Sequence, residues 1–238
     1  MVTFYPHNEG IPTHHAVIVL FRAETGEPLA MMDGRLITEM RTAAVSAVAT
    51  QHLARAEAAV LAILGSGVQA RSHLEALRLV RPFREVRVWS PRHGRTFAER
   101  HGVRATVTPE DAVSGADVVV VATSSRVPVL CGRWLSPGTH VNAIGAVRPD
   151  WRELDDELLA GARLYVESRE AARQESGDVM AAGEVVAEIG EVVAGGHPGR
   201  RSAAETTLFK SVGVAVEDVA AAALVYAAHR TMNHAHDA

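Results

Sequence analysis

Short apolar runs alternate with segments whose apolar residues recur every three or four positions along most of the chain. The apolar runs predict buried strands at residues 15–21, 28–34, 60–64, 85–90, 103–107, 117–123, 140–146, 162–168 and 206–213. The periodic segments predict helices at residues 38–54, 68–80, 95–102, 109–114, 153–160, 178–194 and 214–229. Strands that alternate with helices are typical of a parallel sheet covered on both faces, so the pattern predicts an α/β fold.

The composition is that of an ordinary globular protein, since 47% of the 238 residues are hydrophobic and the formal net charge is −4. This balance gives no electrostatic reason to expect nucleic acid or a membrane surface as a partner. The single cysteine, Cys131, cannot form an internal disulfide, so nothing indicates an oxidising compartment. No apolar run reaches the ~18 residues of a membrane span. We therefore expect a cytoplasmic protein. No metal site is expected, because His229, His234 and His236 lie in a polar tail without a convergent ligand set.

A glycine-rich turn separates a predicted strand from a predicted helix. Gly65 permits the tight turn, Gly67 lets the backbone approach a pyrophosphate, and Ala70 lets the helix pack closely on the strand. The free N–H groups at Val68 and Gln69 then point toward the phosphates. The turn therefore predicts a dinucleotide-binding Rossmann domain with a doubly wound sheet. The alternative is an ordinary strand-to-helix turn made of small residues.

The end of the next predicted strand indicates which nucleotide is bound. In NAD-binding proteins a carboxylate there binds the ribose 2′-hydroxyl, but this strand ends in Ser90-Pro91-Arg92 with no carboxylate. The guanidinium of Arg92 and the hydroxyl of Ser90 suit a 2′-phosphate instead, so NADP(H) is favoured over NAD(H). Thr123 and Ser124 follow a later strand, at the edge of the sheet where ligands bind, and are further candidates for the cofactor.

Four segments are more specific than any periodicity. They are MDGRLITEMRTAAVSAVAT (32–50), VNAIGAVRPDWRELDDELL (141–159), ESGD (175–178) and TLFKSVGVAVEDVAAA (207–222). With them the chain resembles the ornithine cyclodeaminase/mu-crystallin family over nearly its whole length, and most closely the ketimine reductase branch of that family. The resemblance implies a homodimeric enzyme with an NAD(P)-binding Rossmann domain (residues 43–206) and a discontinuous α+β substrate and dimerisation domain (residues 1–42 and 207–238).

The resemblance also implies roles for individual residues. Arg41 and Thr42 match the family's RTAA motif, so Arg41 would bind a substrate carboxylate and Thr42 a cofactor phosphate. The remaining positions that it implies are Phe4 and Glu175 for the substrate pocket and Thr13, His14, Ile144, Ala146 and Ser211 around the nicotinamide.

One departure from the family's pattern favours reduction over cyclodeamination. Family cyclodeaminases carry a catalytic aspartate in a Gly-Gly-Asp-x-Pro stretch, and Val147 occupies that position in Gly145-Ala146-Val147-Arg148-Pro149. A valine cannot transfer a proton. We therefore expect NADPH-dependent reduction of a cyclic ketimine, such as pyrroline- or piperideine-2-carboxylate, to the cyclic amino acid. The alternatives are alanine dehydrogenase or ornithine cyclodeaminase activity, or a non-catalytic protein that binds NADPH or a small carboxylate.

A second departure lies at the N-terminus, because the resemblance aligns Met1 with an interior position of the family's first domain. The preceding family segment holds a substrate-binding arginine and a pocket lysine, so we expect a substrate domain that is N-terminally incomplete. Reduction of a C=N bond needs a proton as well as a hydride. Without that lysine, His14 is the best candidate for the catalytic proton donor by its ordinary pKa.

Overall fold

The computed structural model describes residues 1–5 and 8–234, apart from the side chains of Phe4, Asn233 and His234. Contacts divide the chain into two compact units. The small unit comprises Met1–Thr42 and the segment from Gly213 onward, and the large unit is Ala43–Val212. The second boundary differs from the expected one at residue 207, because residues 207–210 form a strand inside the large unit's sheet.

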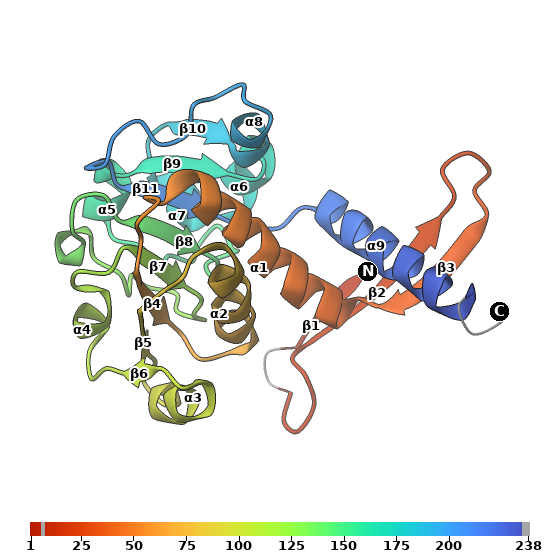
Figure 1. The fold of residues 1–238 in the computed structure, drawn as a ribbon, viewed down its shortest axis with the longest axis horizontal. Helices are drawn as coiled ribbons and strands as arrows, with labels where there is room; N and C mark the ends of the chain where they lie inside the picture. Colours follow the sequence, from red (N-terminus) through yellow and green to blue (C-terminus); the bar gives the residue numbers. More distant parts are fainter. Residues whose placement is uncertain (6–7, 235–238) are drawn as a thin grey trace. The chain divides into compact units, whose positions relative to one another are not determined.

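The small unit contains a three-stranded antiparallel sheet in the order β1-β2-β3. Its strands are Val2–Phe4, His14–Phe21 and Pro28–Asp33. Helix α9 (Ala215–His234) packs on β2, and helix α1 (Gly34–Leu53) starts directly after β3 (Figure 1). Side chains alternate between the two faces of β2, so Leu20 is buried whereas Val19 and Phe21 are exposed.

The large unit is built on an eight-stranded parallel sheet in the order β10-β9-β11-β8-β7-β4-β5-β6 (Figure 1). Its strands are β4 (Val60–Leu64), β5 (Glu85–Trp89), β6 (Arg104–Ala105), β7 (Val118–Val121), β8 (His140–Ala143), β9 (Arg163–Val166), β10 (Val185–Glu188) and β11 (Thr207–Lys210). Its helices are the end of α1, α2 (Val68–Val80), α3 (Gly94–His101), α4 (Pro109–Val113), α5 (Asp156–Gly161), α6 (Arg169–Glu175), α7 (Gly177–Ala181) and α8 (Ile189–Val193), with a 3₁₀ turn at Gly132–Trp134.

Alternate residues of the central strands enter two hydrophobic clusters, one on each face of this sheet. Leu61 and Ile63 of β4 belong to a cluster that includes side chains of α2 and α3. Ala62 and Leu64 belong to the other cluster, which includes side chains of α5 and α7. Burial on both faces explains the continuous apolar runs of these strands, and the predicted doubly wound α/β fold is confirmed.

The order of the strands reverses beside β4. From β4 the chain continues to β5 and β6 on one side, whereas β7 and β8 lie on the other side. Open α/β sheets bind ligands at the carboxyl ends of their strands next to such a switch point. Gly65 follows β4 and Thr123 follows β7, so both lie at this place.

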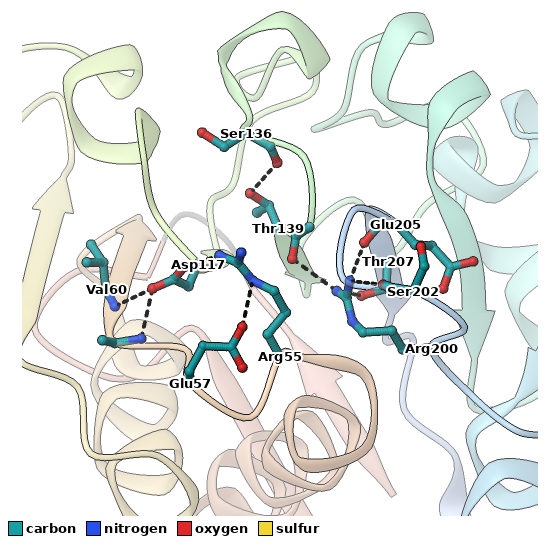
Figure 2. Close-up of polar contacts among 12 residues, drawn as sticks. Arg55, Glu57, Val60, Asp117, Ser136, Thr139, Arg200, Ser202, Glu205 and Thr207 are labelled. Carbon is teal, nitrogen blue, oxygen red and sulfur yellow. Dashed lines mark hydrogen bonds and ion pairs between the residues drawn. The ribbon is translucent and has the colours of Figure 1, made fainter.

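The opposite, amino-terminal edge of the sheet is held together by charged side chains (Figure 2). Asp117 precedes β7, forms an ion pair with Arg55, and accepts hydrogen bonds from the amides of Ala59 and Val60 at 2.8 and 2.9 Å. Arg200 donates to the carbonyl oxygens of Leu53, Gly138, Ser202 and Glu205 and to the hydroxyl of Thr207. These contacts connect loops that are far apart in the sequence and stabilise this edge.

The predicted helix over residues 178–194 is wrong, because this segment forms α7, strand β10 and α8. Its apolar residues fit a helical spacing, but residues 185–188 pair with β9, and tertiary pairing overrides the local pattern. Helix α1 starts at Gly34 rather than at Thr38, and α9 extends to His234 past its predicted end. None of the described helices is long and apolar enough to cross a membrane.

Candidate nucleotide-binding site

The glycine turn connects β4 to α2 at the carboxyl-terminal edge of the large sheet. Gly65 has a φ of +120°, and a Cβ at this position would lie 2.2 Å from the carbonyl oxygen of Ala122. This position therefore requires glycine. A Cβ on Gly67, by contrast, would meet no atom within 4 Å. The backbone at Gly67 thus faces open space that a ligand can enter.

The first turn of α2 carries the polar groups that a phosphate needs. Gly67 is the N-cap and supplies no side-chain hydrogen bond, so the first amides of the helix, at Val68 and Gln69, remain available to a ligand. The Oε1 atom of Gln69 is buried and has no hydrogen-bond partner among the described residues. Open backbone, free amides and an unpartnered amide side chain together fit a dinucleotide.

The end of β5 lies beside this turn. Ser66 Oγ donates a hydrogen bond to Ser90 Oγ at 2.9 Å, which connects the glycine turn to the strand whose end indicates the nucleotide. Arg92 follows in the same loop and is exposed. Both candidates for a 2′-phosphate therefore belong to the loop that is joined to the glycine turn.

The loops after β7 and β8 contain four more of the predicted cofactor residues. Thr123 donates from its amide and its hydroxyl to Oε1 of Glu153, at 2.9 and 2.5 Å, and Ser124 is exposed. Ile144 and Ala146 are buried, and Ala146 has a φ of +52°, the one positive φ of a non-glycine residue within the described part of the chain. A strained residue at a ligand-binding edge persists only where its surroundings hold it firmly.

Ser211 follows β11, between β8 and β9 in the sheet. Its hydroxyl donates to Oε1 of Glu167 at 2.7 Å, and the amide of Val212 donates to Oε2 at 2.9 Å. The loop that contains the candidate Ser211 is thereby anchored to the end of β9. Glu175, a predicted substrate residue, is the last residue of α6 and is exposed.

Sequence reasoning missed three buried ionisable residues behind these loops, namely Glu153, Asp178 and Lys210, each at most 1% exposed. Asp178 accepts hydrogen bonds from the amides of Glu153 and Leu154 at 3.1 and 3.2 Å, and Lys210 Nζ donates to the carbonyl oxygen of Gly145. Burial raises the pKa of Glu153 to about 7 and lowers the pKa of Lys210. A signal existed in the sequence, because Lys210 is the single lysine of the chain and ends an apolar strand.

Three candidates near the N-terminus belong to the small unit. Thr13 Oγ1 lies 3.1 Å from Nδ1 of His14, at the start of β2. Desolvation lowers the pKa of His14, so a smaller fraction of its imidazole carries the proton to be donated at neutral pH. Phe4 belongs to β1, but its side chain lies outside the described residues.

Arg41 also belongs to the small unit and forms two ion pairs there. Its Nη1 atom lies 2.9 Å from Oε2 of Glu217, and its Nε atom lies 3.0 Å from Oδ1 of Asp218. A substrate carboxylate would therefore have to share this guanidinium with two carboxylates. Thr42 donates its hydroxyl hydrogen bond to the carbonyl oxygen of Thr38 at 2.8 Å, one turn earlier in α1.

Residues 1–5 and 8–234 contain no group of three or more His, Cys, Asp or Glu side chains arranged to hold a metal ion. Burial raises the pKa of the Cys131 thiol, which disfavours the nucleophilic thiolate. Of the tail histidines, the side chain of His234 and the whole of His236 lie outside the described residues.

The sequence and the fold of this chain have counterparts in known proteins. The sequence profile of the ornithine cyclodeaminase/mu-crystallin family matches residues 1–233. The chain belongs to this family. Ketimine reductase mu-crystallin of Rattus norvegicus is 50% identical to it over 235 residues, which cover 95% of this chain and 74% of the relative. The resemblance identified from the sequence motifs is thus confirmed.

Two solved structures of relatives share the fold. The Δ1-pyrroline-2-carboxylate reductase of Thermococcus litoralis, in complex with NADH and L-proline, superposes with a TM-score of 0.91 at 39% identity, covering 98% of this chain and 77% of that one. An archaeal alanine dehydrogenase dimer with bound NAD superposes with a TM-score of 0.89 at 38% identity, covering 98% and 77%. The Rossmann-type fold of this family member is therefore well established.

Proposed function

We propose that this chain reduces a cyclic ketimine, such as pyrroline- or piperideine-2-carboxylate, to the cyclic amino acid, with NADPH as the hydride source. The observation that carries the proposal is its 50% identity to a ketimine reductase over 95% of the chain. The solved relative that holds NADH together with L-proline, the product of such a reduction, supports the same reaction. An oxidoreductase acting on a C=N bond is the part of this function that these two relatives share.

The carboxyl-terminal edge of the large sheet would hold the cofactor. The residues proposed for it are Gly65, Gly67, Val68 and Gln69 for the pyrophosphate, Ser90 and Arg92 for the 2′-phosphate, Thr42 for a further phosphate contact, and Thr13, Thr123, Ser124, Ile144, Ala146 and Ser211 for the nicotinamide part. A bound NADPH would supply the hydride. The solved relatives hold NADH and NAD, so the proposed preference for NADPH depends on Ser90, on Arg92 and on the absence of a carboxylate after β5.

The residues proposed for the substrate are Arg41, Phe4 and Glu175, with His14 as the proton donor. Arg41 offers a planar pair of donors to the carboxylate that lies next to the imine carbon. Val147 supports reduction rather than cyclodeamination, because its side chain cannot transfer a proton where a cyclodeaminase has an aspartate.

A second candidate function is alanine dehydrogenase activity, in which the imine of pyruvate and ammonia is reduced. The observation that favours it is the TM-score of 0.89 with an archaeal alanine dehydrogenase. Both reactions reduce a C=N bond beside a carboxylate, so the same cofactor site serves either of them.

Cofactor oxidation followed by absorbance tests both functions. We expect NADPH oxidation with pyrroline-2-carboxylate or piperideine-2-carboxylate, slower oxidation with pyruvate and ammonia, and no ammonia release from ornithine. The matched control is Gly67→Glu, which places a carboxylate in the open space beside α2 and is expected to abolish turnover while the fold is retained. Faster turnover with pyruvate and ammonia would favour the second candidate, and nucleotide binding without turnover would indicate a binding protein.

We also propose that the small unit forms a homodimer through the exposed face of its sheet. This face presents Val17, Val19 and Phe21 of β2 and Met31 of β3, and Met31 is 78% exposed. Contiguous exposed apolar side chains are typical of an interface, and the similar archaeal alanine dehydrogenase is described as a dimer. Light scattering is expected to give a dimer for the wild type and a monomer for Val19→Asp; a monomeric wild type would refute this.

A further inference from the structure

The carboxyl group of Glu153 connects two loops of the candidate site. Its Oε1 atom accepts the hydrogen bonds from the amide and the hydroxyl of Thr123, in the loop after β7. A Cβ on Gly145, in the turn after β8, would lie 2.4 Å from the carboxyl carbon and from both oxygens of Glu153. The carboxyl group therefore packs directly against the backbone of that turn, and it sets the spacing between the two loops.

The second oxygen of this carboxyl group has no hydrogen-bond partner among the described residues. Glu153 Oε2 is buried, and no described residue donates a hydrogen bond to it. An ionised carboxylate in such a place lacks most of its solvation, so burial raises the pKa of Glu153 to about 7. Both the protonated and the ionised form are therefore accessible at neutral pH.

The charges around Glu153 come from several elements of the large unit. Lys210 of β11 favours the ionised form of Glu153, and Asp178 of α7 disfavours it. Arg152 Nε lies 4.0 Å from Oδ1 of Asp178, and Glu167, after β9, interacts electrostatically with Lys210. Loss of the Glu153 proton thus adds one negative charge to a buried cluster directly behind the loops after β7 and β8.

We propose that Glu153 is a positioning residue of the cofactor site whose protonation is coupled to the oxidation state of the nicotinamide. The oxidised ring is cationic, so a site that holds it favours the Glu153 carboxylate, whereas the reduced ring is neutral and favours the carboxylic acid. Only a proton moves, between the Glu153 carboxyl group and water, and no electron is transferred in this step. The inference depends on the proposed cofactor site, because Thr123 and Ala146 belong to the loops that Glu153 holds.

The test compares the dissociation constants of NADP⁺ and NADPH between about pH 6, where Glu153 is mostly protonated, and about pH 8.5, where it is mostly ionised. In the wild type, the ratio of the NADP⁺ constant to the NADPH constant is expected to fall about three- to tenfold as the pH rises. Titration of the 2′-phosphate cancels in this ratio because both nucleotides carry that group. Binding of NADP⁺ near neutral pH is expected to release more protons into weakly buffered solution than binding of NADPH does, because the 2′-phosphate contributes equally to both.

The variant Glu153→Gln keeps an oxygen that can accept from Thr123 but cannot ionise, so its ratio is expected to be independent of pH. Glu99→Gln makes the same change at an exposed residue of α3 and is expected to behave as the wild type does. A Glu153→Gln protein whose ratio still varies like that of the wild type would overturn the proposal. If this variant does not fold, proton release by the wild type decides. Equal proton release on binding of NADP⁺ and of NADPH, or none with either, would overturn the proposal.

Failure of the proposed function looks different from failure of this inference. A wild type that binds no nicotinamide nucleotide would refute the cofactor site and the role of Glu153 together. A wild type that binds both nucleotides with a constant ratio would refute the role of Glu153 alone.

Discussion

The two edges of the large unit's sheet both carry buried or half-buried polar and charged side chains. The hydrogen bonds that these side chains form differ between the edges. At the amino-terminal edge, Arg200 donates to four carbonyl oxygens and one hydroxyl, and Asp117 accepts from two amides while paired with Arg55. The buried atoms without a hydrogen bond at this edge are the Nε atoms of Arg55, Arg81 and Arg163, and each guanidinium has another hydrogen bond or ion pair. At the carboxyl-terminal edge, two buried acceptor atoms, Gln69 Oε1 and Glu153 Oε2, have no hydrogen-bond partner among the described residues.

This difference separates stabilisation from function within one sheet. Buried acceptor atoms are nearly always hydrogen-bonded, so unpartnered acceptors indicate a place where the fold is not optimised for stability alone. The unpartnered atoms Gln69 Oε1 and Glu153 Oε2 lie at the edge where open α/β sheets bind ligands. Perturbing the amino-terminal edge should therefore change the free energy of unfolding, and perturbing the other edge should change nucleotide affinity.

Two glycines with similar geometry give the largest expected effect. A Cβ on Gly138, at the amino-terminal edge, or on Gly65, at the other edge, would lie 2.2 Å from a backbone carbonyl oxygen, and both residues have a positive φ. Gly138→Ala and Gly65→Ala are each expected to lower the free energy of unfolding by about 2–4 kcal/mol, as measured by urea denaturation. The folded Gly138→Ala protein should bind NADPH normally, whereas folded Gly65→Ala should not.

Gly67→Ala is the control for this pair, because its Cβ would meet no atom within 4 Å. It is expected to leave the free energy of unfolding nearly unchanged and to weaken NADPH binding. Loss of NADPH binding by folded Gly138→Ala, with normal binding by folded Gly65→Ala, would contradict the assignment of the two edges.

Periodicity and turn chemistry were sufficient to predict the central part of the fold. The strands at 60–64, 85–89 and 118–121 and the helix at 68–80 follow from local patterns that burial on both faces reinforces. The glycine turn could be located for the same reason, since its residues are contiguous in the sequence. Strand β10 could not be predicted, because its pairing with β9 overrides a helical spacing.

The buried cluster behind the loops proposed for the cofactor could not be predicted from sequence spacing. Glu153, Asp178 and Lys210 are separated by 25 and 32 positions in the chain, and only the parallel sheet and the helices packed on it bring them together. All three belong to segments that carried the family resemblance, but no local pattern assigned them a role. Likewise, the ion pairs of Arg41 with Glu217 and Asp218 join residues from the two ends of the small unit's sequence.

Buried ionisable groups at the two edges are expected to respond to pH in opposite directions. His140 starts β8 and is fully buried; desolvation, aided by the charge of Arg200, lowers its pKa to about 3. In the unfolded chain the His140 imidazole takes up a proton at a higher pH than in the folded protein. The free energy of unfolding therefore decreases as the pH falls below about 6.5. The pKa of Glu153 is raised to about 7, so its stabilising contribution is complete below about pH 4.5 and is lost as the pH rises through 7.

Differences in the free energy of unfolding between wild type and variant isolate each group. Between about pH 6.5 and pH 5, the wild type should lose on the order of 2 kcal/mol relative to His140→Gln. Between about pH 5 and pH 7, the wild type should lose a similar amount relative to Glu153→Gln as the pH rises. If both differences in the free energy of unfolding changed with pH in the same direction, the two edges would not differ in their response to pH.

The smallest expected effect concerns Arg92, at the carboxyl-terminal edge. Because Arg92 is exposed and follows β5, Arg92→Ala should leave the free energy of unfolding unchanged and weaken NADPH binding about tenfold, with no change for NADH. The control is Arg100→Ala, in the last turn of α3, where the helix approaches the amino-terminal edge; it should affect neither nucleotide. Equal weakening of NADPH and NADH by Arg92→Ala would locate Arg92 near a phosphate common to both nucleotides. The absence of a carboxylate after β5 would then be the remaining sequence argument for NADPH.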